Sequence, residues 1–131
     1  MMTSEPIPNE LLGKYESTVI EIFFENKILS PRELYKIWES DFFMITAANP
    51  FSQLLAENEN RKRNQMLYDL LSPQFSEILS AIGRDPEGTW IEHGWIVRAS
   101  NVTQLVALAQ HFQQNAIFRF TSDKKEVVLC V

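Results

Sequence analysis

Four polar segments of this chain carry the side chains that could do chemistry. They span residues 46–52, 59–64, 83–92 and 114–116, and their candidate ligand-binding residues are Asn49, Asn60, Arg63, Asp85, Trp90, Glu92 and Asn115. A carboxylate can transfer protons, a guanidinium can clamp an anion, and carboxamides can position a polar ligand. None of the four segments is a known catalytic signature, so these residues indicate a place to look and not a reaction.

Trp90 and Glu92 are two residues apart on an expected strand, so alternation places both side chains on one face. An aromatic ring beside a carboxylate could hold a planar or cationic ligand. Burial against the ring would raise the pKa of Glu92 toward general acid or base use. The structural alternative is a core tryptophan with Glu92 paired to Arg63.

Asn60, Arg63 and Asn64 continue the core-facing stripe of an expected long helix, where apolar residues would be usual. Buried polar groups need partners. Arg63 could clamp a ligand carboxylate or form an internal salt bridge with Glu92 or Asp85. We favour the internal salt bridge, because a buried arginine is usually paired within its own protein.

Asn49 precedes Pro50 where a buried strand ends and a helix begins, a place where ligand crevices form in sheet proteins with helical crossovers. Asn49 could equally hydrogen-bond only its own turn. Asp85, next to Pro86, is adequately explained as a turn residue. Asn115 ends an expected helix that runs from Asn101.

Several kinds of chemistry are not expected. His93 and His111 lack metal-ligand spacing, and Ser52 does not lie in a G-x-S-x-G elbow. Cys130 resembles a small apolar strand residue, and no glycine-rich phosphate loop is present. We therefore expect no metal, no cofactor and no nucleophilic catalysis.

Composition describes an ordinary globular domain. The chain has 131 residues, 45% of them hydrophobic, and a net charge of −5. The acidic balance argues against nucleic-acid binding, which needs a basic face. The sequence predicts no signal peptide and no membrane span, and a single cysteine favours the reducing cytoplasm.

Hydrophobic periodicity predicts an α/β (α+β) fold: a single mixed sheet of five to six strands with three helices packed on it. Residues 1–14 would form an arm or short helical lead-in, and residues 15–131 one globular domain. The expected strands are 15–24, 42–48, 75–82, 90–99, 116–120 and 126–131. The expected helices are 30–40, with a Ser30 capping box, about 52–72, and 101–115.

The polar segments resemble an uncharacterised bacterial family, domain-of-unknown-function family 3293. The resemblance is carried by Phe43-Met-Ile-Thr-Ala-x-Asn-Pro-x-Ser52, Glu59-Asn-x-x-Arg63, Gly83-x-Asp-Pro-x-Gly-x-Trp-x-Glu92 and Phe112-x-Gln-Asn-Ala116. It covers most of the chain from about Tyr15 onward. The resemblance implies a small cytoplasmic α/β protein and no particular activity.

Three functions follow from these observations. The first is a non-enzymatic binding or regulatory module that recognises a small polar molecule or a protein partner. The second is a small enzyme acting on a polar metabolite, with Glu92 as general acid or base, Arg63 as anion clamp and Asn49 positioning the substrate. In the third, the polar residues only stabilise the fold.

Overall fold

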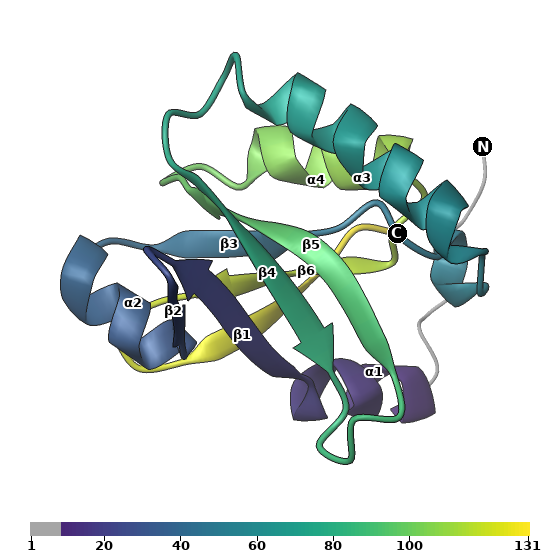
Figure 1. Cartoon of the computed structure of the whole chain (residues 1–131), viewed down its shortest axis with the longest axis horizontal. Helices are drawn as coiled ribbons and strands as arrows, with labels where there is room; N and C mark the ends of the chain where they lie inside the picture. Colours follow the sequence, from purple (N-terminus) through teal and green to yellow (C-terminus); the bar gives the residue numbers. More distant parts are fainter. Residues whose placement is uncertain (1–8) are drawn as a thin grey trace.

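The computed structural model describes residues 9–131, which contain one sheet of seven strands in the order β2-β1-β4-β5-β3-β6-β7 (Figure 1). The strands are β1 (Val19–Phe24), β2 (Lys27–Leu29), β3 (Phe42–Ile45), β4 (Ile78–Arg84), β5 (Ile91–Arg98), β6 (Ala116–Phe120) and β7 (Lys125–Leu129). The predicted α+β class is confirmed. Every neighbouring pair is antiparallel, so the expected mixed sheet of five to six strands differs in strand direction and number.

Hairpin turns join β1 to β2, β4 to β5 and β6 to β7, and such short connections make these three pairs antiparallel. The strand that the sequence did not predict is β2, a three-residue edge strand. Its pattern is too short to show alternation, and only pairing with β1 defines it.

Four α-helices lie within the described residues, in place of the three expected: α1 (Asn9–Ser17), α2 (Pro31–Trp38), α3 (Glu57–Leu71) and α4 (Thr103–His111). Figure 1 shows α3 and α4 side by side over one face of the sheet, with α1 on the opposite face. None of the helices between residues 9 and 131 is long and apolar enough to cross a bilayer.

The sheet separates two apolar clusters. Leu67 of α3 and Leu105 of α4 pack on one side, and Leu34 of α2 packs on the other with Tyr15 of α1 at its edge. All four residues of β3 are buried, with Phe43 and Ile45 in the first cluster and Phe42 and Met44 in the second. The prediction of a central strand buried on both faces is therefore confirmed.

The start of α2 matches the prediction from its capping box. The Ser30 hydroxyl accepts the Glu33 N–H, and the Glu33 carboxylate accepts the Ser30 N–H at 2.9 Å. These bonds satisfy two donors that a helix start otherwise leaves unpaired.

The predicted start of the first strand is wrong. The first strand begins at Val19 and not at Tyr15, because α1 continues to Ser17 and ends where the Thr18 hydroxyl donates to the Lys14 carbonyl. The predicted lead-in ends inside α1, and its first eight residues lie outside the described part of the chain.

The long helix was expected to be capped by Ser52 or a residue soon after it, and it begins at Glu57 with Ala56 at its N-cap position. The single 3₁₀ turn η1 (Pro50–Ser52) precedes it, and positive φ angles at Phe51 and Ser52 prevent a continuous helix.

Candidate functional site

The end of β3 is where the predicted polar residues meet. The β3–β5 ladder ends with the pair Ile45 and Trp95, after which the two chains separate. The register would next bring the Ala47 N–H opposite the His93 carbonyl. Instead the Asn64 carboxamide lies between them, accepting from Ala47 N at 2.8 Å and donating to His93 O at 3.1 Å. A side chain of α3 thus replaces the missing ladder bonds.

The close approach of β3 at this point requires glycine at position 94. A Cβ atom on Gly94 would lie 2.8 Å from the Ile45 carbonyl oxygen and 3.2 Å from Thr46 Cβ. The Thr46 hydroxyl also donates to the His93 carbonyl, at 2.6 Å. The strands therefore part immediately beyond their tightest contact, and the gap that follows is filled by polar side chains.

Arg63 lies one helical position before Asn64 and holds the same segment. Its Nε donates to the Ala47 carbonyl at 2.6 Å, and Nη2 donates to the Phe112 carbonyl at the end of α4. The favoured salt bridge with Glu92 or Asp85 is wrong, and Arg63 makes no ion pair with any described residue. The guanidinium instead donates to two backbone carbonyls that lie just beyond the ends of β3 and α4.

The predicted anion-clamp role for Arg63 does not fit this geometry, since its side chain is committed to backbone carbonyls. Gln114 lies in the polar segment 114–116 but was not among the candidate ligand-binding residues, and it does similar work: its side chain is buried, and Nε2 donates to the Ala48 carbonyl at 2.9 Å. A polar residue just after a helix end was the only sequence signal for this role of Gln114. The carbonyl that accepts its bond lies 66 positions earlier in the chain, so the sequence could not identify it.

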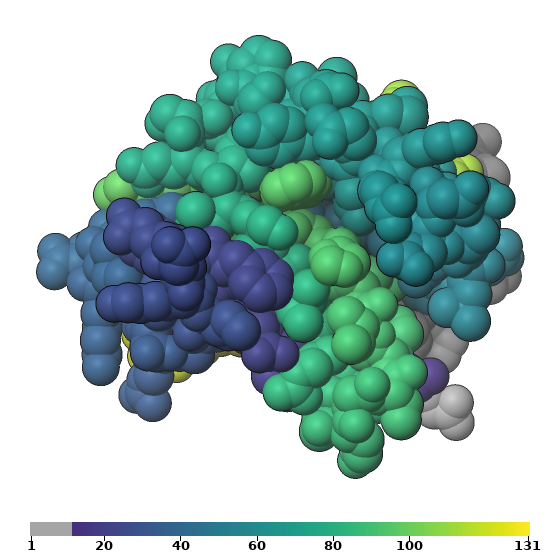
Figure 2. Space-filling model, viewed as in Figure 1, coloured from purple at the N-terminus to yellow at the C-terminus, as the bar shows by residue number. Residues whose placement is uncertain are grey.

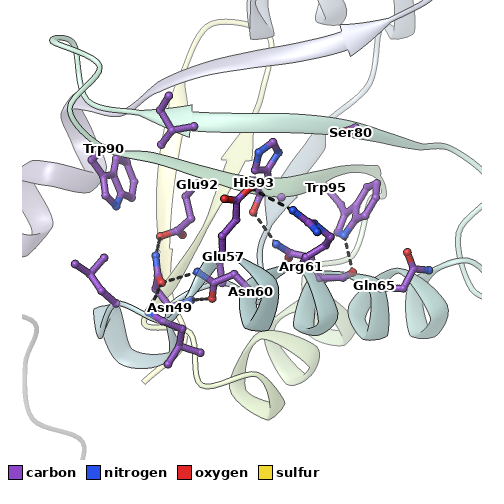
Figure 3. A pocket seen from close by; sticks show the side chains of 16 residues that line it. Asn49, Glu57, Asn60, Arg61, Gln65, Ser80, Trp90, Glu92, His93 and Trp95 are labelled. Carbon is purple, nitrogen blue, oxygen red and sulfur yellow. Dashed lines mark hydrogen bonds and ion pairs between the residues drawn. The ribbon is translucent and has the colours of Figure 1, made fainter.

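Asn49 connects this scaffold to Glu92. Its backbone N–H donates to Asn60 Oδ1, and Asn60 Nδ2 donates back to Asn49 Oδ1, both at 2.8 Å (Figure 3). Asn49 Oδ1 also accepts the Leu55 N–H at 3.0 Å, and Nδ2 donates to Glu92 Oε2 at 2.9 Å. Every polar group of the Asn49 side chain is thereby oriented, with its amide directed at the carboxyl group. Asn49 therefore braces its own turn, and it also lines a groove, where its role in binding a ligand stays a prediction.

Glu92 is half-buried, and Asn49 is its hydrogen-bond partner among residues 9–131. Burial raises the pKa of this carboxyl to about 7, and the bond from Asn49 lowers it only in part. Within the described chain no cationic side chain forms an ion pair with it. The other carboxyl oxygen, Oε1, has no hydrogen-bond partner among the described residues. Every described side-chain oxygen without a partner is in contact with solvent, so Oε1 is accessible.

Trp90 and Glu92 line the same groove, as alternation predicted. Asp85 does not reach it. Its carboxylate accepts the Trp90 N–H at 2.9 Å and the Thr89 hydroxyl, and the Thr89 bond is the main cause of its lowered pKa. Asp85 is therefore a turn residue, as interpreted from the sequence. Its bond to the Trp90 N–H fixes the direction of the backbone at Trp90.

Asn115 also lies away from the groove. Its amide donates to the Ser52 hydroxyl at 3.2 Å, and the Ser52 hydroxyl lies 3.5 Å from the Tyr15 hydroxyl of α1. Tyr15 has a raised pKa, chiefly because of burial. Asn115 therefore ties the η1 turn to α1 and is not a wall of the site.

The groove has a volume of about 800 Å³ and lies between β5 and the first half of α3. In Figure 2 the teal atoms of α3 border the green atoms of β5 on this face. Figure 3 shows Trp90, Glu92, His93 and Trp95 along the strand side, with Glu57, Asn60 and Arg61 on the helix. Leu54 and Ile91 add exposed apolar side chains at its edge, 81% and 55% exposed.

The sequence did not single out Trp95, Leu54 or Arg61 for this groove. Trp95 packs against Tyr68 and donates its indole N–H to the Asn64 carbonyl at 3.0 Å, so one ring edge belongs to the core. Leu54 had one usable signal, an apolar residue in a polar connection before a helix. Arg61 is paired with Glu57 at 3.3 Å, and both side chains are exposed.

The described residues hold no cluster of three or more histidine, cysteine, aspartate or glutamate side chains that could bind a metal ion. The groove therefore offers one carboxyl group with a perturbed pKa, two indoles, oriented carboxamides and an apolar edge. This arrangement can bind a ligand of modest size or exchange a proton near neutral pH.

A family model described as "Protein of unknown function (DUF3293)" matches residues 45–117, more than half of the chain. The chain therefore belongs to this family. The matched span contains all seven predicted site residues and both walls of the groove. None of the curated proteins and none of the solved structures matches the chain.

Proposed function

We propose that this member of the DUF3293 family is a non-enzymatic binding module whose groove between α3 and β5 receives a small polar molecule. One observation carries the proposal: the Glu92 carboxyl is half-buried in a groove, positioned by Asn49, and its second oxygen is free to accept a bond. Buried polar groups are normally paired, so an oriented but incompletely paired carboxyl suits a ligand.

The scaffold supports this function by keeping the site rigid. Asn60 and Asn64 are held on α3, and their bonds determine where residues 47–49 lie relative to β5. A preorganised site loses little conformational entropy on binding. The third hypothesis, a purely structural network, accounts for Arg63, Asn64 and Gln114, but it assigns nothing to the free oxygen of Glu92.

A thermal-shift screen against nucleotides, amino acids, sugars, organic acids and metals tests the proposal. A ligand at 100 times its Kd adds about 2.7 kcal/mol, which raises the melting temperature of a domain this size by about 10 °C. Leu54→Ala removes an exposed side chain at the groove, and Ile28→Ala removes another exposed apolar side chain, on β2 and away from the groove.

The shift should fall in the Leu54→Ala variant and stay unchanged in the Ile28→Ala variant. Equal shifts in both variants would locate the ligand elsewhere and refute the assignment of the groove. No shift across the panel would contradict small-molecule binding and favour a protein partner.

A specific observation favours a second candidate, an enzyme that uses Glu92 as general acid or base. Its pKa of about 7 is suited to proton transfer at neutral pH. Asn49 would position the substrate, as the sequence suggested, but Arg63 is not available as an anion clamp. Turnover of a ligand found in the screen, lost in the Glu92→Gln variant with binding retained, would establish this alternative.

We also propose a cytoplasmic location in a bacterial cell and no binding of nucleic acid. A single cysteine, buried in the second-last position of the chain, supports the first, because oxidising compartments favour disulfides. The net charge of −5 supports the second.

A further inference from the structure

We propose that the ligand of the groove is an organic cation, an ammonium, guanidinium or amidinium group on an apolar body, which pairs with the Glu92 carboxylate beside Trp90. The inference rests on the proposed binding function and names the class of ligand. It follows from the charge balance of the groove, the aromatic surface next to the carboxyl and the position of the apolar edge.

Charge balance is the first argument. The ionisable side chains that line the groove are Glu57, Arg61, Glu92 and His93. Arg61 and Glu57 neutralise one another at 3.3 Å and are 74% and 87% exposed, so water screens both. Glu92 has no such partner among the described residues, and an ionised Glu92 leaves the lining with one uncompensated negative charge.

The groups around Glu92 from other elements do not supply that missing cation. Asn49 and Asn60 are neutral carboxamides. Tyr15 on α1 is close enough that the Glu92 charge contributes to its raised pKa, and as a neutral phenol it brings no positive charge. Arg63 on α3 is held by two carbonyls. Within residues 9–131 no side chain supplies a counter-ion to Glu92, which leaves this role to a ligand.

The surroundings of the carboxyl favour an organic cation over a hydrated metal ion. Trp90, just before β5, and Trp95 of β5 line the groove together with Glu92, and indole faces attract cations more strongly than other aromatic rings do. Leu54 and Ile91 provide an apolar edge for the body of such a molecule. No described group of three metal-ligating side chains is present, whereas an amidinium needs only one carboxylate and a ring. The net charge of −5 draws cations toward the protein as a whole.

Binding of a cation would ionise Glu92, so the affinity must depend on pH. The pKa of about 7 means that most Glu92 is protonated at pH 5.5 and must lose its proton on binding. Linkage then predicts affinity about 25-fold weaker at pH 5.5 than at pH 7.5, and release of about 0.9 proton per ligand at pH 6. His93 also lines the groove, and any effect of its side chain on the affinity would persist in a Glu92→Gln variant.

Two matched pairs of probes test the inference: benzamidine against benzamide, and tyramine against tyrosol. Each pair keeps the body of the molecule and changes the charge. Titration calorimetry measures affinity and proton release, and NMR signals of the Trp90 and Trp95 indoles report occupancy, with Trp38 on α2 as an internal reference. Glu92→Gln removes the charge, and Glu25→Gln in the exposed β1–β2 turn makes the same change in net charge away from the groove.

At pH 7.5 the cation of at least one pair should bind at least tenfold tighter than its neutral partner. Glu92→Gln should abolish that preference and the proton release, and Glu25→Gln should retain both. Neutral probes that shift the Trp90 signal as strongly as the cations would overturn the inference while leaving the binding groove intact. A preference that survives in Glu92→Gln would overturn it as well. A panel without any binding of cations at millimolar concentration would contradict the ligand class.

Discussion

The Glu92→Gln substitution should stabilise the protein at alkaline pH and leave its stability unchanged in acid. Glutamine has nearly the same shape, and its carbonyl oxygen can still accept the bond that Asn49 donates at 2.9 Å. The substitution therefore removes one property of the site, the cost of ionising a half-buried carboxyl. The difference between the two proteins measures that cost.

The magnitude follows from the pKa of Glu92, which rises from 4.5 to about 7 in the folded protein. A shift of this size corresponds to about 3 kcal/mol, which partial exposure reduces to about 2–3 kcal/mol. Because the folded-state pKa is raised, the folded protein holds the Glu92 proton more tightly than the unfolded chain does. The wild-type protein therefore loses stability as pH rises from about 4.5 to about 7, and its stability changes little further above that window.

Urea unfolding followed by circular dichroism, at intervals from pH 4.5 to pH 9, measures the difference in the free energy of unfolding. The variant and the wild-type protein should agree near pH 4.5, and the variant should be more stable by about 2–3 kcal/mol at pH 8, a midpoint shift of about 1–2 M urea. Glu25→Gln, with the same change in net charge, should follow the wild-type curve. A variant that is less stable at pH 8, or a difference that does not vary with pH, would refute the picture of a half-buried carboxyl without a cationic partner.

Three further predictions concern the scaffold. Arg63→Ala should destabilise the protein by about 2–4 kcal/mol, because two carbonyls lose their donors. Arg61→Ala on the same helix should cost about 0.5 kcal/mol or less, because its ion pair is exposed. Comparable costs of the two substitutions in urea unfolding would contradict this prediction. Gly94→Ala should lower the free energy of unfolding by about 2–4 kcal/mol, because its Cβ would approach the Ile45 carbonyl oxygen. Gly13→Ala in α1 meets no atom within 4 Å and should be neutral or stabilising. A tolerated Gly94→Ala would mean that β3 and β5 can separate further. Burial raises the pKa of the Cys130 thiol to about 11, so iodoacetamide should modify it much more slowly in the folded protein than in urea, and equal rates would place the thiol at the surface.

Local sequence patterns predicted much of the fold because they act over a few residues. The Ser30 capping box, the buried run at Phe42 and the inward face through Leu67 and Leu71 are all as expected. The interpretation of Asp85 as a turn residue is similarly local, since its partner Trp90 is five positions away. The strand directions and the short edge strand β2 depend on pairing between distant segments, which periodicity does not report.

In the candidate site too, the sequence predicted local features and missed contacts between distant segments. The sequence placed Asn60, Arg63 and Asn64 on the inner side of their helix, because helical spacing fixes the face on which a residue lies. Their partners could not be predicted in this way. Arg63 pairs with carbonyls at positions 47 and 112, since those are the backbone groups that β3 and α4 leave unpaired where they end.

For Glu92, the sequence established its proximity to Trp90 and the possibility of a raised pKa, both consequences of strand alternation. Only the tertiary structure decided whether a cationic side chain neutralises the Glu92 carboxylate. It directs Arg63 toward the backbone, and it leaves Asn49 as the partner of Glu92 among the described residues. The groove also depends on folding, because its walls are a helix and a strand from separate parts of the sequence, joined by the hydrogen bond from Asn64 to the His93 carbonyl. Side-chain type and spacing determine which face a residue occupies, but the electrostatic state of that residue depends on neighbours that only folding brings together.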